Sequence, residues 1–248
     1  MNKLRIVIAD DERPARMFLK NILADCEDAE IVGEAENGAE AVEIIKRTRG
    51  VSLEPKSLPD GDPLAYQMLS AGETFGVFQL ESGGMRRAIQ DLRPESVSEL
   101  AAMVALYRPG PMQHIPTFCR AKHGEEAIRY PHADLAEVLD ETYGVIVYQD
   151  QVLLIAQRFA GYTLGEADIM RKAMGKKIAE KMRAERERFR QGAVNKGYTA
   201  DDADKIFDLI EPFAGYAFNK AHAVCYGTIS YQTAYLKANY TVEYMTAV

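Results

Sequence analysis

The sequence predicts a mixed fold, in which a small, truncated α/β unit precedes a mostly α-helical region with a few short strands. Three features of the 248 residues support this prediction. Strand-like and helix-like runs alternate in residues 1–50, a connector rich in Pro, Gly and Asp occupies residues 51–62, and helix-capping patterns recur in residues 63–248. These ranges are the three predicted segments of the chain.

The first segment reads as strand, helix, strand, helix. The apolar runs LRIVIA and EIVGEA are the predicted strands, and the predicted helices cover residues 14–23 and the residues after Asn37-Gly38. This order begins a doubly wound parallel sheet. Asp10 and Asp11 follow the first strand, at the sheet edge where such folds bind ligands, so they are candidate Mg²⁺ ligands.

Two capping patterns mark the beginnings of helices in the third segment. Thr163 and Glu166 have the spacing of a capping box, in which each side chain bonds the backbone N–H group of the other residue. The helix that follows is predicted over residues 164–174 and ends at Gly175. A Thr-x-x-Asp pattern that begins at Thr199 repeats the device.

Two short apolar runs in the same segment predict strands. They are GVFQL (Gly76–Leu80) and GVIVY (Gly144–Tyr148). Tyr148 ends the second run and is expected in the core, as part of a buried strand.

The charge distribution is uneven along the chain. A net charge of -7 counts against nucleic acid as a partner, because phosphate backbones attract Lys and Arg. Residues 158–196 reverse this balance, with eleven basic and five acidic residues. Glu and Arg pairs on a solvated helix are an alternative explanation, which suits residues 185–190 better than residues 171–177.

A loop rich in glycine and aromatic residues leads into a predicted helix within Phe213–Leu236. The free N–H groups at a helix start, together with the helix dipole, favour a bound anion. Asn219 is a favoured cap residue for this helix, and a capped core helix with a solvated lysine is the alternative. The side chains that could hold a phosphate, base or sugar are Tyr216, Phe218, Asn219, Lys220 and His222.

The cysteines and the apolar runs indicate the cellular compartment of the protein. Cys26, Cys119 and Cys225 lie far apart and form no Cys-x-x-Cys pair, which argues against a disulfide framework and a zinc site. No apolar run approaches the length that crosses a bilayer. These features predict a cytoplasmic protein without a membrane partner.

Five blocks in the third segment occur in the order and at the spacing of one family. Residues 53–248 resemble the fingers region of the alpha subunit of bacterial DNA polymerase III, the C-family replicative polymerase. The blocks are GVFQLESGGM (76–85), ALYRPGPM (105–112), ETYGVIVYQDQV (141–152), GYTLGEADIMRKAMGKK (161–177) and FAGYAFNKAHAVCYGTISYQTAYLKA (213–238).

The resemblance implies roles for the cationic residues. Arg171 and Lys172 fall where the family has two arginines that clamp the triphosphate of the incoming deoxynucleoside triphosphate (dNTP). Lys172 keeps the charge but lacks the planar fork of an arginine, which implies a less oriented grip. The other residues implied to bind dNTP or phosphate are Lys176, Lys177, Asn219, Lys220 and His222, with Tyr216 and Phe218 near the base or sugar.

Residues 1–49 resemble a different family. IVIADDERPAR and IVGEAENGAEAVEII are similar to the opening of a response-regulator receiver domain. The connector then replaces the strand that carries the phosphate-accepting aspartate in receivers. The resemblance therefore covers only the beginning of such a domain, in which Asp10 and Asp11 are the Mg²⁺-binding pair.

Together these features predict a fragment of a DNA-directed DNA polymerase, a nucleotidyltransferase of DNA replication. The implied partners are dNTP, primer-template DNA and other replicase subunits, with Mg²⁺ as the cofactor that accompanies dNTP. The family's catalytic aspartates lie in the palm, upstream of this span, so no catalytic residue is predicted and the fragment is expected to be inactive alone. The alternatives are a two-component signalling protein with a receiver-like N-terminus and a helical output module, and a non-functional chimera.

Overall fold

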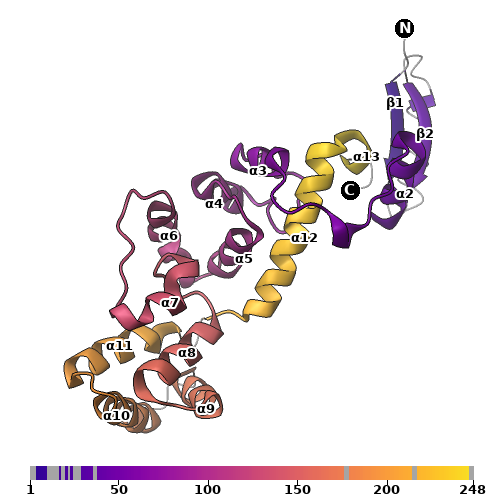
Figure 1. Cartoon of the computed structure of the whole chain (residues 1–248). Helices are drawn as coiled ribbons and strands as arrows, with labels where there is room; N and C mark the ends of the chain where they lie inside the picture. Colours follow the sequence, from indigo (N-terminus) through magenta and orange to yellow (C-terminus); the bar gives the residue numbers. More distant parts are fainter. Residues whose placement is uncertain are drawn as a thin grey trace. The chain divides into compact units, whose positions relative to one another are not determined.

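The computed structural model describes residues 4–9, 17, 20, 21, 23, 24, 29–35, 38–175, 179–213 and 217–245. Most of these residues are helical, which confirms the predicted mostly helical character (Figure 1). The chain divides into two compact units, the first formed by Met1–Ser96 and Ile229–Val248 and the second by Val97–Thr228. None of the helices in the described part is long and apolar enough to cross a membrane.

The first unit begins with two strands and a helix. β1 (Leu4–Ala9) and β2 (Ala29–Ala35) lie where strands were predicted and pair in parallel. α2 (Gly38–Arg49) follows as the second predicted helix. Of the first predicted helix, over residues 14–23, the structure describes residues 17, 20, 21 and 23, all of them helical.

Local signals start the other helices of the first unit. The Asp62 carboxylate accepts a 2.8 Å bond from the N–H of Ala65 and is followed by Pro63, a residue suited to a first helical position. Ser82 caps the next helix in the same way. Besides α2, the described helices of this unit are η1 (Pro55–Ser57), α3 (Pro63–Ser70), α4 (Gly83–Leu92), α13 (Thr241–Met245) and the part of α12 (Lys220–Asn239) from residue 229 onward.

The predicted strand at Gly76–Leu80 is wrong, because this segment forms consecutive turns. The N–H of Val77 bonds the carbonyl of Thr74, and the N–H of Leu80 bonds the carbonyl of Val77, each at 3.0 Å. These turns bury Val77 and Leu80 completely. The N–H groups of Val77 and Leu80 are thus used within the turns, and the N–H of Phe78 donates to the Thr233 hydroxyl at 3.2 Å, so none of the three pairs with a neighbouring strand.

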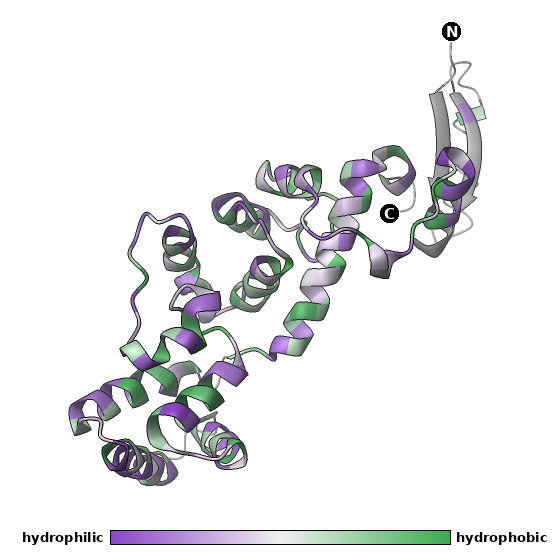
Figure 2. Ribbon diagram, viewed as in Figure 1, coloured by the Kyte–Doolittle hydropathy of each residue, from purple (hydrophilic) through white to green (hydrophobic). Residues whose placement is uncertain are grey.

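The second unit is helical and has an aromatic core. The rings of Phe159 and Phe189 stack at 6.2 Å, and Phe207 meets Phe189 edge-on at 5.6 Å. Figure 2 shows that most of α10 is hydrophilic, so its contribution to this core comes from a few buried residues such as Phe189 and Ala193. The elements are α5 (Val97–Leu106), η2 (Pro111–His114), α6 (Ile115–Lys122), η3 (Ala133–Leu135), α7 (Ala136–Leu139), η4 (Asp140–Thr142), α8 (Gln149–Ala160), α9 (Leu164–Gly175), α10 (Ala179–Asn195), α11 (Ala200–Phe213) and the beginning of α12.

The predicted capping box at the start of α9 is confirmed. The N–H of Thr163 donates to the Glu166 carboxylate at 2.9 Å, and the N–H of Glu166 donates to the Thr163 hydroxyl at 3.3 Å. α9 ends at Gly175 as predicted. At the start of α11 the Thr199 hydroxyl accepts from the N–H of Asp202 at 3.0 Å and donates to the carboxylate of that residue.

The Glu166→Gln variant is expected to lose stability at neutral pH and to respond less to acid. Bonds from the Thr163 N–H and hydroxyl, and then the bond from Arg188, hold the pKa of Glu166 below its ordinary value. Its ionised form therefore stabilises the fold above the pKa of the unfolded chain, and this contribution disappears as the pH falls through the lower folded pKa. Urea unfolding at pH 7 and at about pH 3 measures the difference.

The control for this experiment is Glu125→Gln. Glu125 lies in the same unit, and the described residues give its carboxylate no partner, so its removal is expected to leave the pH response of the protein unchanged. If Glu166→Gln shows the same loss of stability between pH 7 and pH 3 as the wild type, the assigned role of the capping box is wrong.

The predicted strand at Gly144–Tyr148 is also wrong. Only Tyr148, among these residues, takes part in a bridge, which is an isolated parallel pairing with Phe218. The N–H groups of Val147 and Tyr148 donate instead to the Gln151 side chain, at 2.8 and 3.0 Å. A buried amide thus replaces the neighbouring strand that the apolar pattern suggested. Tyr148 is nevertheless buried, as expected.

Candidate functional site

Asn219 caps α12, as predicted from the sequence. Its Oδ1 accepts from the N–H of His222 at 2.9 Å, and its carbonyl accepts from the N–H of Ala223 at 3.0 Å. Asn219 and His222 are both exposed. The positive end of the helix dipole therefore carries polar side chains that a ligand can reach.

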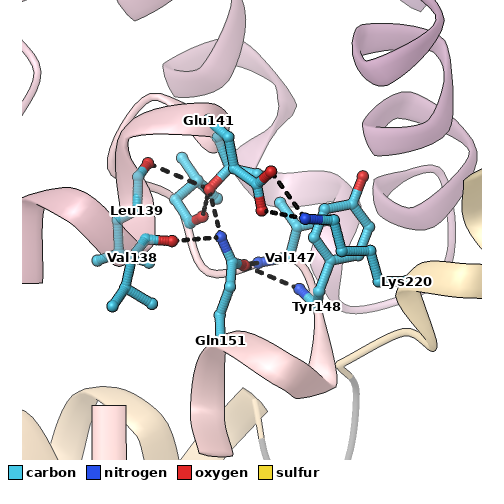
Figure 3. Close-up of polar contacts among 9 residues, drawn as sticks. Val138, Leu139, Glu141, Val147, Tyr148, Gln151 and Lys220 are labelled. Atoms are coloured by element: carbon cyan, nitrogen blue, oxygen red, sulfur yellow. Dashed lines mark hydrogen bonds and ion pairs between the residues drawn. The ribbon is translucent and has the colours of Figure 1, made fainter. Parts of the chain in front are cut away.

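Lys220, the first residue of α12, forms an ion pair with Glu141. Its Nζ lies 2.7 Å from Oε1 and 2.8 Å from Oε2 of Glu141, as Figure 3 shows. The same amine lies 5.6 Å from the centre of the Tyr148 ring, a cation–π distance. The lysine is therefore paired within the protein and is not the freely solvated side chain of the alternative explanation.

Gln151 organises the segment that surrounds this amine. Its Oε1 accepts the two N–H groups of Val147 and Tyr148, while its Nε2 donates to the Val138 carbonyl at 3.2 Å and to the Thr142 hydroxyl at 2.7 Å (Figure 3). Gln151 is 2 % exposed, so these bonds are shielded from water. The network holds the chain at Thr142, next to Glu141, and at Tyr148. Glu141 and Tyr148 are the two residues that contact Lys220.

Neither Glu141 nor Gln151 was recognised as a functional residue from the sequence. Both lie in the block ETYGVIVYQDQV, where the apolar residues suggested a buried strand. The available signal was a glutamine three residues after the end of an apolar run, because a buried amide needs several hydrogen-bond partners. The pairing of Glu141 with Lys220 spans 79 residues and has no local signal.

Phe218 connects α12 to the beginning of α8. Its N–H donates to the Val147 carbonyl at 3.1 Å, and its carbonyl accepts from the N–H of Gln149 at 2.9 Å. The Arg108 guanidinium lies 4.3 Å from the centre of the Phe218 ring, and the His222 ring lies 5.4 Å from it. One face of the Phe218 ring is thus covered by the Arg108 guanidinium. Arg108 therefore lies beside the residue that was predicted to contact a base or sugar.

Arg171 and Lys172 lie at the end of α9 and share one carboxylate. Asp168 accepts from Arg171 at 2.8 Å and from Lys172 at 2.6 Å, and Lys172 is the more exposed of the two. The bonds from Lys172 and then Arg171 lower the pKa of Asp168. The two positive charges therefore exceed the single negative charge by one, on the surface of the second unit.

Several predicted site residues fall outside the described residues. They are Asp10, Asp11, Lys176, Lys177 and Tyr216. In the part of the chain that the structure does describe, no group of three His, Cys, Asp or Glu side chains could hold a metal ion. The described residues therefore do not fit a resident Mg²⁺ site.

Comparison with known proteins identifies the family. Residues 39–197 match the finger domain of the bacterial DNA polymerase III alpha subunit, which is more than half of the chain. The chain belongs to the DNA polymerase III alpha family. The resemblance of the five sequence blocks is confirmed. The match begins within α2, before the predicted boundary at residue 50, and does not test the receiver-like reading of residues 1–49.

Relatives in the DNA polymerase III alpha family extend the likeness beyond the finger domain. The alpha subunit of Thermus aquaticus is 52 % identical over 214 residues, which cover 84 % of this chain and 18 % of the relative. The subunit of Borreliella burgdorferi is 49 % identical and that of Bacillus subtilis 46 %, with 85 % and 82 % of this chain covered. The chain spans less than a fifth of the length of these relatives.

Proposed function

We propose that the chain supplies the nucleotide-binding fingers section of a replicative DNA polymerase. The observation that carries this proposal is the positively charged Lys220 at the capped start of α12, in a chain of the DNA polymerase III alpha family. Its exposed neighbours Asn219 and His222 offer further donors. Oriented donors beside a helix start suit the triphosphate of an incoming dNTP.

The second part of the proposed site is the pair Arg171 and Lys172 on α9. Support for a shared site comes from the connection of α8 to α9 through only three residues, Gly161–Thr163, and from the packing of these helices on each other. We infer that α9 returns along α8, as in a helical hairpin, so that the last turn of α9 approaches the beginning of α8. Phe218 is bonded to that beginning of α8, directly before Asn219 and Lys220.

The proposed activity is binding without phosphoryl transfer. Transfer needs carboxylate-held metal ions, and the family resemblance implies that the catalytic aspartates lie in the palm, outside the fingers section. Mg²⁺ is therefore proposed to arrive with the triphosphate as part of the ligand. Template phosphates, primer-template DNA, other replicase subunits and a cytoplasmic location belong to the same proposal, which rests on the family of the chain for these partners.

The Lys220→Met variant is expected to bind dATP with Mg²⁺ about ten-fold more weakly than the wild type, because it loses a charge-assisted bond to phosphate. Isothermal titration calorimetry at fixed ionic strength measures this difference. The matched control is Lys205→Met, which removes a lysine that also pairs with a carboxylate, that of Asp201 on the same helix. An absence of binding to the wild type at millimolar dATP would disprove the retained nucleotide site.

A further inference from the structure

Glu141 forms an ion pair with Lys220, the cation that the proposed nucleotide site needs. Both of its oxygens lie within 2.8 Å of the Lys220 amine. Two anionic oxygens on one carbon present to an ammonium group much the same contacts as two oxygens on a phosphorus atom. The carboxylate therefore stands in the place that a phosphate group of the ligand would take.

The position of Glu141 is set by its buried neighbours. Thr142, the next residue, is 1 % exposed and bonds the Val145 carbonyl, and the Gln151 amide bonds the Thr142 hydroxyl in turn. Figure 3 shows this network directly beside the carboxylate. The backbone at residue 141 is thus anchored, whereas Lys220 reaches Glu141 through a flexible four-carbon stem.

The pair is also open to a competing ligand. The side chains of Glu141 and Lys220 are 46 % and 38 % exposed, so water and solutes reach both groups. Burial, and then the charge of Glu141, raise the pKa of Tyr148, which keeps its phenol neutral. The amine can therefore exchange one anion for another while its contact with the Tyr148 ring remains.

The pairing of Asp168 with Arg171 and Lys172 is a weaker case of the same kind. Those residues are three and four positions apart on α9, a spacing that brings opposite charges together on most helices. Glu141 comes from a different element than Lys220 and is held by a buried network, so helical spacing does not account for its position.

We propose that Glu141 is an internal competitor for the anion at Lys220, holding the amine in the free protein and yielding it when a triphosphate binds. This inference rests on the proposed nucleotide-binding function. A cation that is engaged in the free state lowers the apparent affinity for its ligand by the fraction of time it is engaged. Glu141 would thus favour ligands that carry several negative charges over weak single anions.

The Glu141→Gln variant tests this proposal, since glutamine keeps the size of the side chain and removes its charge. We expect dATP with Mg²⁺, and inorganic tripolyphosphate, to bind it about two- to five-fold more tightly than the wild type at 0.15 M salt. A loss of folding cannot produce such a gain. In the Lys220→Met background, Glu141→Gln is expected to give no gain, because the pair no longer exists.

The control is Asp150→Asn, which removes the same charge from the exposed first turn of α8. An equal gain from Asp150→Asn would show that net charge alone is responsible, and it would overturn the proposal. Wild-type binding that Lys220→Met weakens and Glu141→Gln leaves unchanged would overturn the proposal but leave the nucleotide-binding function intact. If neither the wild type nor Glu141→Gln binds either probe, the function and this inference both fail.

Discussion

The Lys122→Met variant is expected to lower the free energy of unfolding by about 3–5 kcal/mol. The Lys122 amine lies 3.4 Å from the Glu99 carboxylate, and the two side chains are only 5 % and 9 % exposed. Tyr143 donates to the other oxygen of Glu99 at 2.7 Å. Methionine fills a similar volume but removes the Lys122 amine from beside the buried charge of Glu99, and this loss costs more than the pair itself contributes.

Urea unfolding followed by far-ultraviolet circular dichroism measures this loss, and a double variant separates charge from packing. Glu99→Gln combined with Lys122→Met removes both charges, so it is expected to recover most of the stability. Lys205→Met breaks an exposed ion pair with Asp201 and is expected to cost at most about 1 kcal/mol. Equal losses for Lys122→Met and Lys205→Met would contradict the importance of burial at the Glu99 pair.

The helix boundaries that were predicted correctly are set by contacts between residues close together in the sequence. Thr163 and Glu166 begin α9, and Gly175 ends it, where the capping rules placed these boundaries. Asn219 begins α12 through its own side chain. Such bonds span three residues or fewer, so the sequence pattern contains both partners of each contact.

The two strand predictions were wrong for the same physical reason. An apolar run shows that a segment is buried but does not show which groups satisfy its backbone N–H groups. At Val77 the partner is a carbonyl three residues earlier, and at Val147 it is the side chain of Gln151. Neither partner is a strand, and neither is apparent from the alternation of residue types.

The sequence indicated the basic residues of the candidate site but not the acidic residues that pair with them. Arg171, Lys172 and Lys220 stand out in the sequence because basic residues cluster near glycine and near a helix start. Asp168 lies three and four positions before Arg171 and Lys172 on α9, whereas Glu141 pairs with Lys220 from a distant part of the chain. The proposed competition between Glu141 and a bound anion therefore depends on the folded protein, because the local sequence does not show this pairing.

The Gly192→Ala variant is expected to cost about 3 kcal/mol of stability, the upper end of the usual range for overpacking. A Cβ atom on Gly192 would lie 2.1 Å from the carbonyl oxygen of Ala160, at the end of α8. This atom belongs to the backbone, so no side-chain rotation relieves the clash. α10 also cannot withdraw easily, because its neighbouring residues Phe189 and Ala193 are fully buried in the core.

Gly165→Ala provides the matched control, since it makes the same chemical change in another helix of the second unit. A Cβ atom on Gly165 would meet no other atom within 4 Å. Alanine there restricts the unfolded chain and favours the helix, so a gain of about 0.5–1 kcal/mol is expected. Urea unfolding measures whether the free energy of unfolding falls in Gly192→Ala and rises in Gly165→Ala. If Gly192→Ala also stabilises the protein, α8 and α10 do not pack at the close distance that the structure shows.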